Sequence, residues 1–156
     1  MKLPLLAVGG TFDHFHKGHE SLLLKAFELG EVVIVGVTSD EFAKKMGKNE
    51  IQDFNQRMGQ VKAFLIIQHL IERAKLIELH DAFGPLSEDP GVCGVVVTQE
   101  TLENAERANR IRLEKGMPPL KIFVHDFLLA KDGRPISSSR IRNKEIDERG
   151  YVLRKN

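Results

Sequence analysis

The sequence predicts an α/β fold in which helices cover a buried parallel sheet. Five apolar runs are spaced along the 156 residues, and amphipathic helical patterns stand between them. Each run is continuous rather than alternating, as is typical of a strand that is buried on both faces. Because strands and helices alternate, the strands are expected to be parallel with right-handed crossovers.

The expected strands are rich in valine, leucine and isoleucine, and they cover residues 3–8, 32–37, 74–79, 92–97 and 120–124. The expected helices cover 21–29, 42–46, 54–71 and 102–115, with another from about Ser138 and a charged one at 145–149. Gly30 is expected to end the first helix as its C′ residue. The polar stretch 47–53 is expected to be a mobile loop, and 151–156 a basic tail.

Length and composition narrow the class of protein. A chain of this length fits one domain, residues 1–156, with a sizeable core. The net charge of +1 provides no general field for nucleic acid, so any anion site is local. No run reaches the roughly 18 apolar residues of a membrane span, and the start of the chain lacks a signal peptide's apolar segment. The single cysteine, Cys93, favours a reducing cytoplasm and is expected to be a small buried side chain.

The stretch from residue 9 to residue 19, with the letters GGTFDHFHKGH, is the strongest functional signal. A strand, a glycine turn and a helix start present free backbone N–H groups to an anion. Gly9 and Gly10 let the backbone approach a phosphate, since no Cβ intervenes. His16 and His19 flank the helix start, whose positive end disfavours protonation, so the rings are expected to be neutral donors. We interpret this stretch as a triphosphate site.

Two other interpretations of the histidines stay open. They could merely cap the helix and pack against it. Alternatively, His14, His16 and His19 could hold zinc, for which imidazole is a common ligand. A zinc site usually completes its shell with cysteine or carboxylate, and the sequence shows no second cluster that would do so.

Residues 11–19 resemble the T-F-D-x-x-H-x-G-H signature of the nucleotidyltransferases that carry an H-x-G-H motif. Residues 136–142, ISSSRIR, are similar to the second signature of that superfamily, I-S-S-[ST]-x-x-R. Two motifs so far apart in the expected order are more specific than either alone. The element Asp81-x-x-Gly84-Pro85, Asn109-Arg110 and Pro118 resemble the archaeal and eukaryotic branch of the pantetheine-phosphate adenylyltransferases.

This resemblance implies a Rossmann-like, doubly wound sheet of five parallel strands in the order 3-2-1-4-5. It also implies adenylyl transfer from ATP to 4′-phosphopantetheine, with Mg²⁺ bound through the ATP phosphates. A cytidylyltransferase acting on another phosphate monoester and a non-catalytic ATP-binding module are the alternatives. Small-molecule substrates are the expected partners, without nucleic acid or membrane. The sequence does not fix the oligomeric state, and a monomer is the expectation.

The resemblance also assigns roles to individual residues. The expected catalytic residues are His16, His19, Lys44, Ser138 and Arg142. The expected substrate- and ATP-binding residues are Gly9, Gly10, Thr11, Phe12, Gly18, Lys45, Ser137 and Ser139. Thr98, Glu100 and Thr101 are added as candidates by position, because the R-G-L-R element that the bacterial enzymes carry there is absent from this chain. Either Lys44 or Lys45 would hold the acceptor phosphate. Arg57 matches an arginine of the superfamily but is expected to be a solvated cation. No metal-ligand set is expected from the protein.

The residue types also fit this chemistry. No activated nucleophile is apparent, because Cys93 has no basic neighbour in sequence and the serines lack the G-x-S-x-G elbow. A phosphate monoester is already an anion at neutral pH, so its attack on ATP needs no general base. The protein must align two polyanions and neutralise the charge that develops. Histidines, amides, hydroxyls, a lysine and an arginine can do this.

Overall fold

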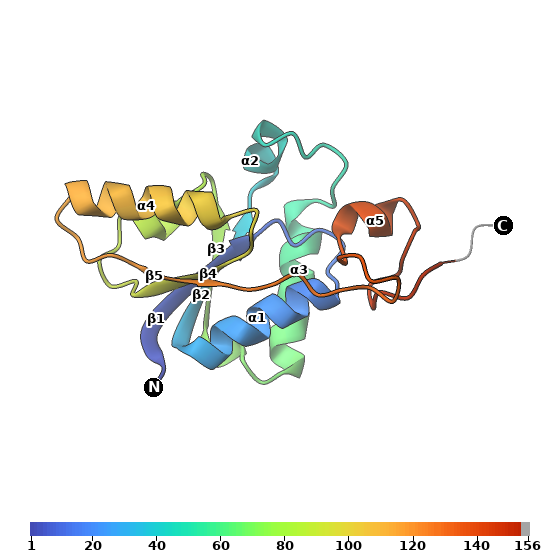
Figure 1. The fold of residues 1–156 in the computed structure, drawn as a ribbon, viewed down its shortest axis with the longest axis horizontal. Coiled ribbons are helices and arrows are strands. Elements are labelled where there is room, and N and C mark those ends of the chain that lie inside the picture. Colours follow the sequence, from blue (N-terminus) through green and yellow to red (C-terminus); the bar gives the residue numbers. More distant parts are fainter. Residues whose placement is uncertain (154–156) are drawn as a thin grey trace.

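The computed structural model describes residues 1–153 and contains a five-stranded parallel sheet (Figure 1). The strands are β1 (Leu3–Gly10), β2 (Gly30–Thr38), β3 (Ala74–Leu79), β4 (Gly94–Val97) and β5 (Lys121–Val124). Their order is β3-β2-β1-β4-β5, and each neighbouring pair is parallel. The predicted α/β class and strand order are therefore confirmed. Residues 154–156 of the expected basic tail lie outside the described residues.

Helices cover both faces of this sheet (Figure 1). The helices are α1 (Lys17–Leu29), α2 (Asp40–Lys45), α3 (Phe54–Ile67), α4 (Leu102–Glu114) and α5 (Ser138–Arg142), with short 3₁₀ turns η1 (Ile71–Arg73) and η2 (Gly84–Ser87). Helices α1 and α3 lie on one face and α4 lies on the other. Among the described residues, no helix is both long and apolar enough to cross a bilayer.

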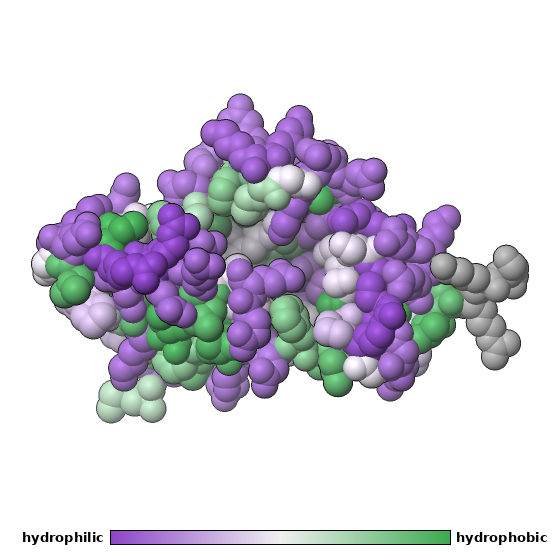
Figure 2. All heavy atoms as spheres, turned by 45° about the horizontal axis from the view of Figure 1, so that its top comes forward, coloured by the Kyte–Doolittle hydropathy of each residue, from purple (hydrophilic) through white to green (hydrophobic). Residues whose placement is uncertain are grey.

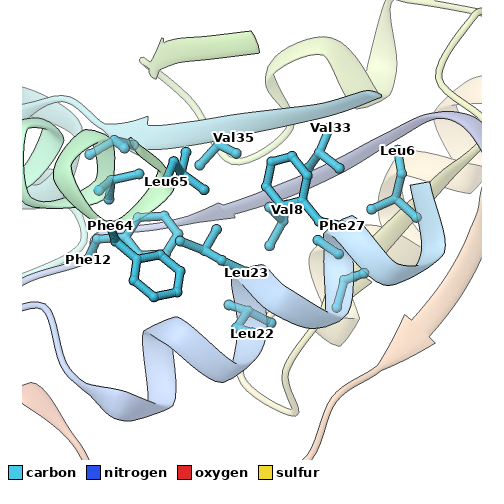
Figure 3. Packing of buried hydrophobic residues seen from close by; sticks show 14 residues of the cluster. Leu6, Val8, Phe12, Leu22, Leu23, Phe27, Val33, Val35, Phe64 and Leu65 are labelled. Atoms are coloured by element: carbon cyan, nitrogen blue, oxygen red, sulfur yellow. The ribbon is translucent and has the colours of Figure 1, made fainter. Parts of the chain in front are cut away.

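The core follows from the alternation of side chains along the buried strands. Val33 and Val35 of β2 point to the face that α1 and α3 cover, where they pack with Leu23 and Leu65 (Figure 3). Ile34, between the two valines, points to the opposite face and packs in the cluster under α4. Because both faces are covered, the strand has no polar side, which explains its continuous apolar run.

Gly30 ends α1, as the sequence predicted, and β2 begins at this residue. Its φ is −120°, so it is extended and not in the left-handed conformation common for a glycine at a helix end. A Cβ at Gly30 would lie 2.8 Å from the Cβ of Leu6. Glycine is therefore suited to this position because the backbone passes close to β1.

The predicted charged helix at 145–149 is also wrong. Residues 143–151 form turns, closed by an isolated bridge between Ile146 and Val152. The carboxylate of Asp147 accepts hydrogen bonds from the backbone N–H groups of Arg149 and Tyr151, both at 2.9 Å. Such local side-chain to backbone bonds compete with helix formation.

Two smaller expectations also change. The predicted helix 54–71 ends at Ile67, because His69 adopts a left-handed φ of 58° and breaks it before η1. Cys93 precedes β4 and is half-buried rather than buried, with its thiol directed at the carbonyl of Gly91 at 3.4 Å.

Candidate active site

A cleft of about 430 Å³ lies at the carboxyl ends of the strands, where the strand order reverses between β1 and β4. Figure 2 shows a hollow near the middle of this face. Ligands of open α/β sheets bind at such a switch point. The predicted site residues that line the cleft are Gly9, Gly10, Thr11, Phe12, His16, Gly18, His19, Thr98, Glu100, Thr101, Ser137, Ser138, Ser139 and Arg142.

The two motif histidines cap α1 reciprocally. His16 is the N-cap residue, and its Nδ1 accepts a hydrogen bond from the backbone N–H of His19 at 3.3 Å. The Nδ1 of His19 accepts in turn from the backbone N–H of His16 at 3.2 Å. A neutral imidazole whose Nδ1 accepts carries its proton on Nε2. Each ring therefore caps the helix and keeps an Nε2–H donor for a ligand.

Gly18 is what makes this arrangement possible. A Cβ at this position would lie 2.8 Å from Cε1 and 3.0 Å from Nδ1 of His16. The imidazole ring of His16 would have to move away from the helix start, and its cap would be lost. The glycine between the two histidines is therefore a packing requirement of the cap.

Both rings are neutral at pH 7. The pKa of His16 is lowered to about 4, mainly by burial. The negative charge of Asp13 opposes this effect, and His14 adds to it. Burial also lowers the pKa of His19 well below its usual value, assisted by His16 and Lys48. The neutral donors predicted from the helix end are thus present, although burial is the main cause.

The zinc interpretation has no support in this geometry. In the part of the chain that the structure describes, no group of three His, Cys, Asp or Glu side chains could hold a metal ion. His14 has a left-handed φ of 45°, and its Nε2 lies 3.9 Å from an oxygen of Asp13. His16 and His19 use their Nδ1 atoms in the helix cap.

The lysine that the structure brings to the cleft is Lys48. Its Nζ donates to the hydroxyl of Thr11 at 2.9 Å, and it lines the cleft. Lys44 and Lys45 are exposed on α2 and do not belong to the cleft lining. The cleft-facing residues of α2 and its end are Phe42 and Met46, which are four positions apart and share one face. The sequence offered only a weak signal for Lys48, its place in the polar loop after α2.

Arg57 is buried, and the expectation of a solvated cation is wrong. Its side chain is fully inaccessible to solvent. The guanidinium donates to the carbonyl of Thr11 at 2.8 Å, to the carbonyl of Gln52 at 2.9 Å and to the carboxylate of Asp40 at 2.9 Å. Arg57 therefore fixes the backbone of the first motif and of the loop that carries Lys48.

The second motif contacts the first directly. Ser137 is the N-cap of α5, and its Oγ accepts from the backbone N–H of Arg140 at 3.3 Å. The hydroxyl of Ser138 donates to the carbonyl of Asp13 at 2.5 Å. Arg142 donates from Nη1 to the carboxylate of Asp13 at 2.7 Å. The imidazole pair and the serine cluster therefore lie at one cleft.

His125 and Asp126 also line the cleft, and the sequence interpretation did not include them. They follow β5 directly, at the same edge of the sheet as Thr98, so their position after a predicted strand was an available signal. The Nε2 of His125 lies 2.9 Å from the hydroxyl of Ser21 on α1. Polar side chains that follow β4 and β5 thus line the cleft, and Ser21 of α1 contacts one of them, His125.

Comparisons with known proteins show the family of the chain. Residues 7–144 match the model of the cytidylyltransferase-like family, and the chain belongs to that family. It is 42% identical over 143 residues to a phosphopantetheine adenylyltransferase of Methanopyrus kandleri, covering 92% of this chain and 90% of the relative. It is 42% identical over 154 residues to the enzyme of the same name from Methanothermobacter thermautotrophicus, covering 99% and 92%.

A solved structure also resembles the chain closely. A protein of unknown function from Archaeoglobus fulgidus superposes with a TM-score of 0.70 at 30% identity, covering 81% of this chain and 90% of that one. The family, together with the strand–turn–helix site, defines a nucleotidyltransferase.

Proposed function

We propose that this protein transfers the adenylyl group of ATP to 4′-phosphopantetheine, giving dephospho-CoA and pyrophosphate in coenzyme A biosynthesis. The observation that carries the proposal is the contact of the two motifs, through Ser138 and Arg142 to Asp13, at one cleft. The relatives named phosphopantetheine adenylyltransferase, which align over nearly the whole chain, support the choice of substrates.

In the proposed reaction, an oxygen of the acceptor phosphate attacks the α-phosphorus of ATP. A new P–O bond forms as the bond from the α-phosphorus to the bridging oxygen breaks, and pyrophosphate leaves with that electron pair. The attacking oxygen is already anionic, so no proton has to be removed. Catalysis therefore depends on alignment and on donors at the developing charge.

The described residues suggest where each phosphate lies. The Nε2–H groups of His16 and His19 are neutral donors for the ATP phosphates, with His19 nearest the reacting phosphorus. Thr11 and Lys48, whose hydroxyl and ammonium groups are 2.9 Å apart, form a pair for the acceptor phosphate. Ser138 and Arg142, together with the adjacent serine hydroxyls, hold the leaving pyrophosphate.

The lining of the cleft also supports an assignment of the rest of each substrate. Its apolar side chains, Phe42, Met46, Leu79, Phe83 and Leu86, suit the pantetheine arm. Its polar side chains after β4 and β5, Thr98, Glu100, Thr101 and His125, suit a nucleoside.

We infer that ATP enters as its magnesium complex. The described residues contain no cluster of three possible metal-ligating His, Cys, Asp or Glu side chains. Asp13, a carboxylate in the cleft, already accepts from Gln52 and Arg142. Phosphate oxygens and water would therefore supply most ligands of Mg²⁺, which typically keeps several waters. Bound there, the ion would neutralise phosphate charge.

We further infer that the protein works in the cytoplasm as a monomer. The single cysteine suits a reducing compartment.

Pyrophosphate release tests the proposed function. The purified protein is mixed with Mg²⁺, either ATP or CTP, and either 4′-phosphopantetheine or glycerol 3-phosphate. We expect release only with ATP and 4′-phosphopantetheine together. A preference for CTP or glycerol 3-phosphate would instead indicate a cytidylyltransferase. Calorimetric binding of ATP without release from any acceptor would indicate a non-catalytic module.

A further inference from the structure

Asp13 belongs to the first motif and contacts the second, and the reaction described above gives it no contact with substrate. Its side chain is only 3% exposed, although it is charged. A buried carboxylate is costly unless it is fully hydrogen-bonded. Both of its oxygens are bonded here, and each bond leads to a different wall of the cleft.

One oxygen is bound to the loop on the acceptor side. Asp13 Oδ1 accepts from the backbone N–H of Gln52 at 2.8 Å. The side-chain oxygen of Gln52 accepts in return from the backbone N–H of His14 at 3.0 Å. The same loop carries Lys48, four residues before Gln52, which reaches Thr11. This oxygen therefore fixes the distance between the first motif and the lysine loop.

The other oxygen is bound to the pyrophosphate side. Asp13 Oδ2 accepts from Nη1 of Arg142 at 2.7 Å, and the carbonyl of Asp13 accepts from the hydroxyl of Ser138. The second guanidinium nitrogen, Nη2, lies 3.2 Å from the hydroxyl of Ser139. Arg142 is thus oriented by the carboxylate of Asp13 and the hydroxyl of Ser139, and it keeps further donor capacity for phosphate.

The backbone around Asp13 is strained. Phe12 and His14 have left-handed φ values of 55° and 45°, although neither is glycine. Such conformations cost free energy and persist only where surrounding contacts hold them. The bonds of Asp13 to Gln52, Ser138 and Arg142 are among the contacts that hold this loop.

We propose that Asp13 is a positioning residue for adenylyl transfer, holding the lysine loop and Arg142 at a fixed separation across the cleft. This inference rests on the proposed function. The attacking phosphate and the leaving pyrophosphate must lie in line through the α-phosphorus. A misplacement of about 1 Å in such a geometry can cost roughly 10²-fold in rate.

The test is Asp13→Asn, which keeps the size of the side chain and one oxygen acceptor for the N–H of Gln52. The amide has no negative charge, and its NH₂ group would face the donor of Arg142. We expect kcat at saturating ATP and 4′-phosphopantetheine to fall at least tenfold. Calorimetric titration with a non-hydrolysable ATP analogue gives the fraction of binding-competent protein, so kcat is expressed per competent site. A merely structural role would lower that fraction and leave kcat per competent site unchanged.

The matched control is Asp132→Asn, because Asp132 also pairs with an arginine of α5, Arg140, but lies outside the cleft lining. We expect its kcat per competent site to stay within about twofold of wild type. The double variant Asp13→Asn/Arg142→Met should be no more than about twofold slower than Arg142→Met alone, since coupled residues are not additive.

Turnover of Asp13→Asn within threefold of wild type per competent site would overturn the proposal, as would additivity with Arg142→Met. Failure of the proposed function is a separate result, in which wild type releases no pyrophosphate from any acceptor. In that case the ATP analogue still tests Asp13. The affinity of the protein for the ATP analogue should fall at least fivefold in Asp13→Asn, and an unchanged affinity would contradict the positioning role.

Discussion

His16 and His19 each accept, at Nδ1, a hydrogen bond from the backbone N–H of the other, and their rings stack with centroids 3.6 Å apart. This reciprocal cap fixes both tautomers before any ligand arrives. It also satisfies two N–H groups at the start of α1. Donors that are oriented in advance need no reorganisation during the reaction, which is the condition for strong electrostatic catalysis.

His19→Ala should lower kcat by about 10²-fold or more, because loss of one transition-state donor has this effect in other enzymes. Pyrophosphate release at saturating substrates is the measurement. His80→Ala is a suitable control, since the side chain of His80 is 67% exposed and its contact with Glu78 is a surface one. Near-normal turnover of His19→Ala would remove His19 from the mechanism.

Stability should fall as the pH drops from 6.5 to 4. The pKa of His16 is about 4 in the folded chain and 6.5 in its ordinary state, so the unfolded chain binds more protons in this range. The stabilisation that comes from keeping His16 neutral in the folded chain is fully present above pH 6.5, and it is lost as the pH falls through 4. A shift of this size corresponds to about 3 kcal/mol of unfolding free energy.

Urea unfolding at several pH values would measure this loss of stability. His16→Asn keeps a side-chain oxygen for the cap and removes the titrating group. Its unfolding free energy should therefore depend less steeply on pH between 4 and 6.5. An equally steep dependence in this variant would assign the effect to other groups, among them His19, whose lowered pKa acts in the same direction.

Lys48→Met should lower kcat/KM for 4′-phosphopantetheine by roughly 10- to 100-fold, the range expected for a lost hydrogen bond to a charged group. Lys44→Met and Lys45→Met are closely matched controls, because each removes the same charge from a neighbouring exposed position. We expect both to stay within about twofold of wild type. A larger effect at Lys44 or Lys45 than at Lys48 would restore the assignment made from the sequence.

Arg57→Met should lower the free energy of unfolding by about 2–4 kcal/mol, because the buried carbonyls of Thr11 and Gln52 lose their donor. Arg110→Met provides the control, since Arg110 is exposed on α4 and should change stability by about 0.5 kcal/mol or less. Denaturant unfolding measures both. A value for Arg57→Met as small as that of the control would show that water replaces the lost donor.

The fold and most of the candidate site could be predicted because their signals are local. Continuous apolar runs predicted the buried strands, and the strand, glycine turn and histidines of the first motif predicted residues that line the cleft. Two helix predictions were wrong: the helix predicted over 54–71 ends at Ile67, before the left-handed His69, and no helix covers 145–149. At 145–149, the carboxylate of Asp147 accepts hydrogen bonds from backbone N–H groups and stabilises turns, which the pattern of charges in the sequence does not indicate.

Burial of a charged side chain could not be predicted in the same way. Arg57 and Arg112 are both fully buried, and Arg112 donates to the carbonyls of Leu86, Asp89, Val92 and Pro118. An arginine in a helical pattern is usually solvated, and only the path of distant loops supplies the carbonyls that make its burial possible.

By itself, the sequence determined the order of elements, the buried faces of the strands and the two motif segments that we propose bind phosphate, because each depends on residues close together in the chain. Only the tertiary structure decided that Lys48 rather than Lys44 or Lys45 lies in the cleft, and that Asp13 joins the two motifs. These outcomes depend on contacts between segments 37 to 129 residues apart, whose distances are set by how the whole sheet and its loops pack.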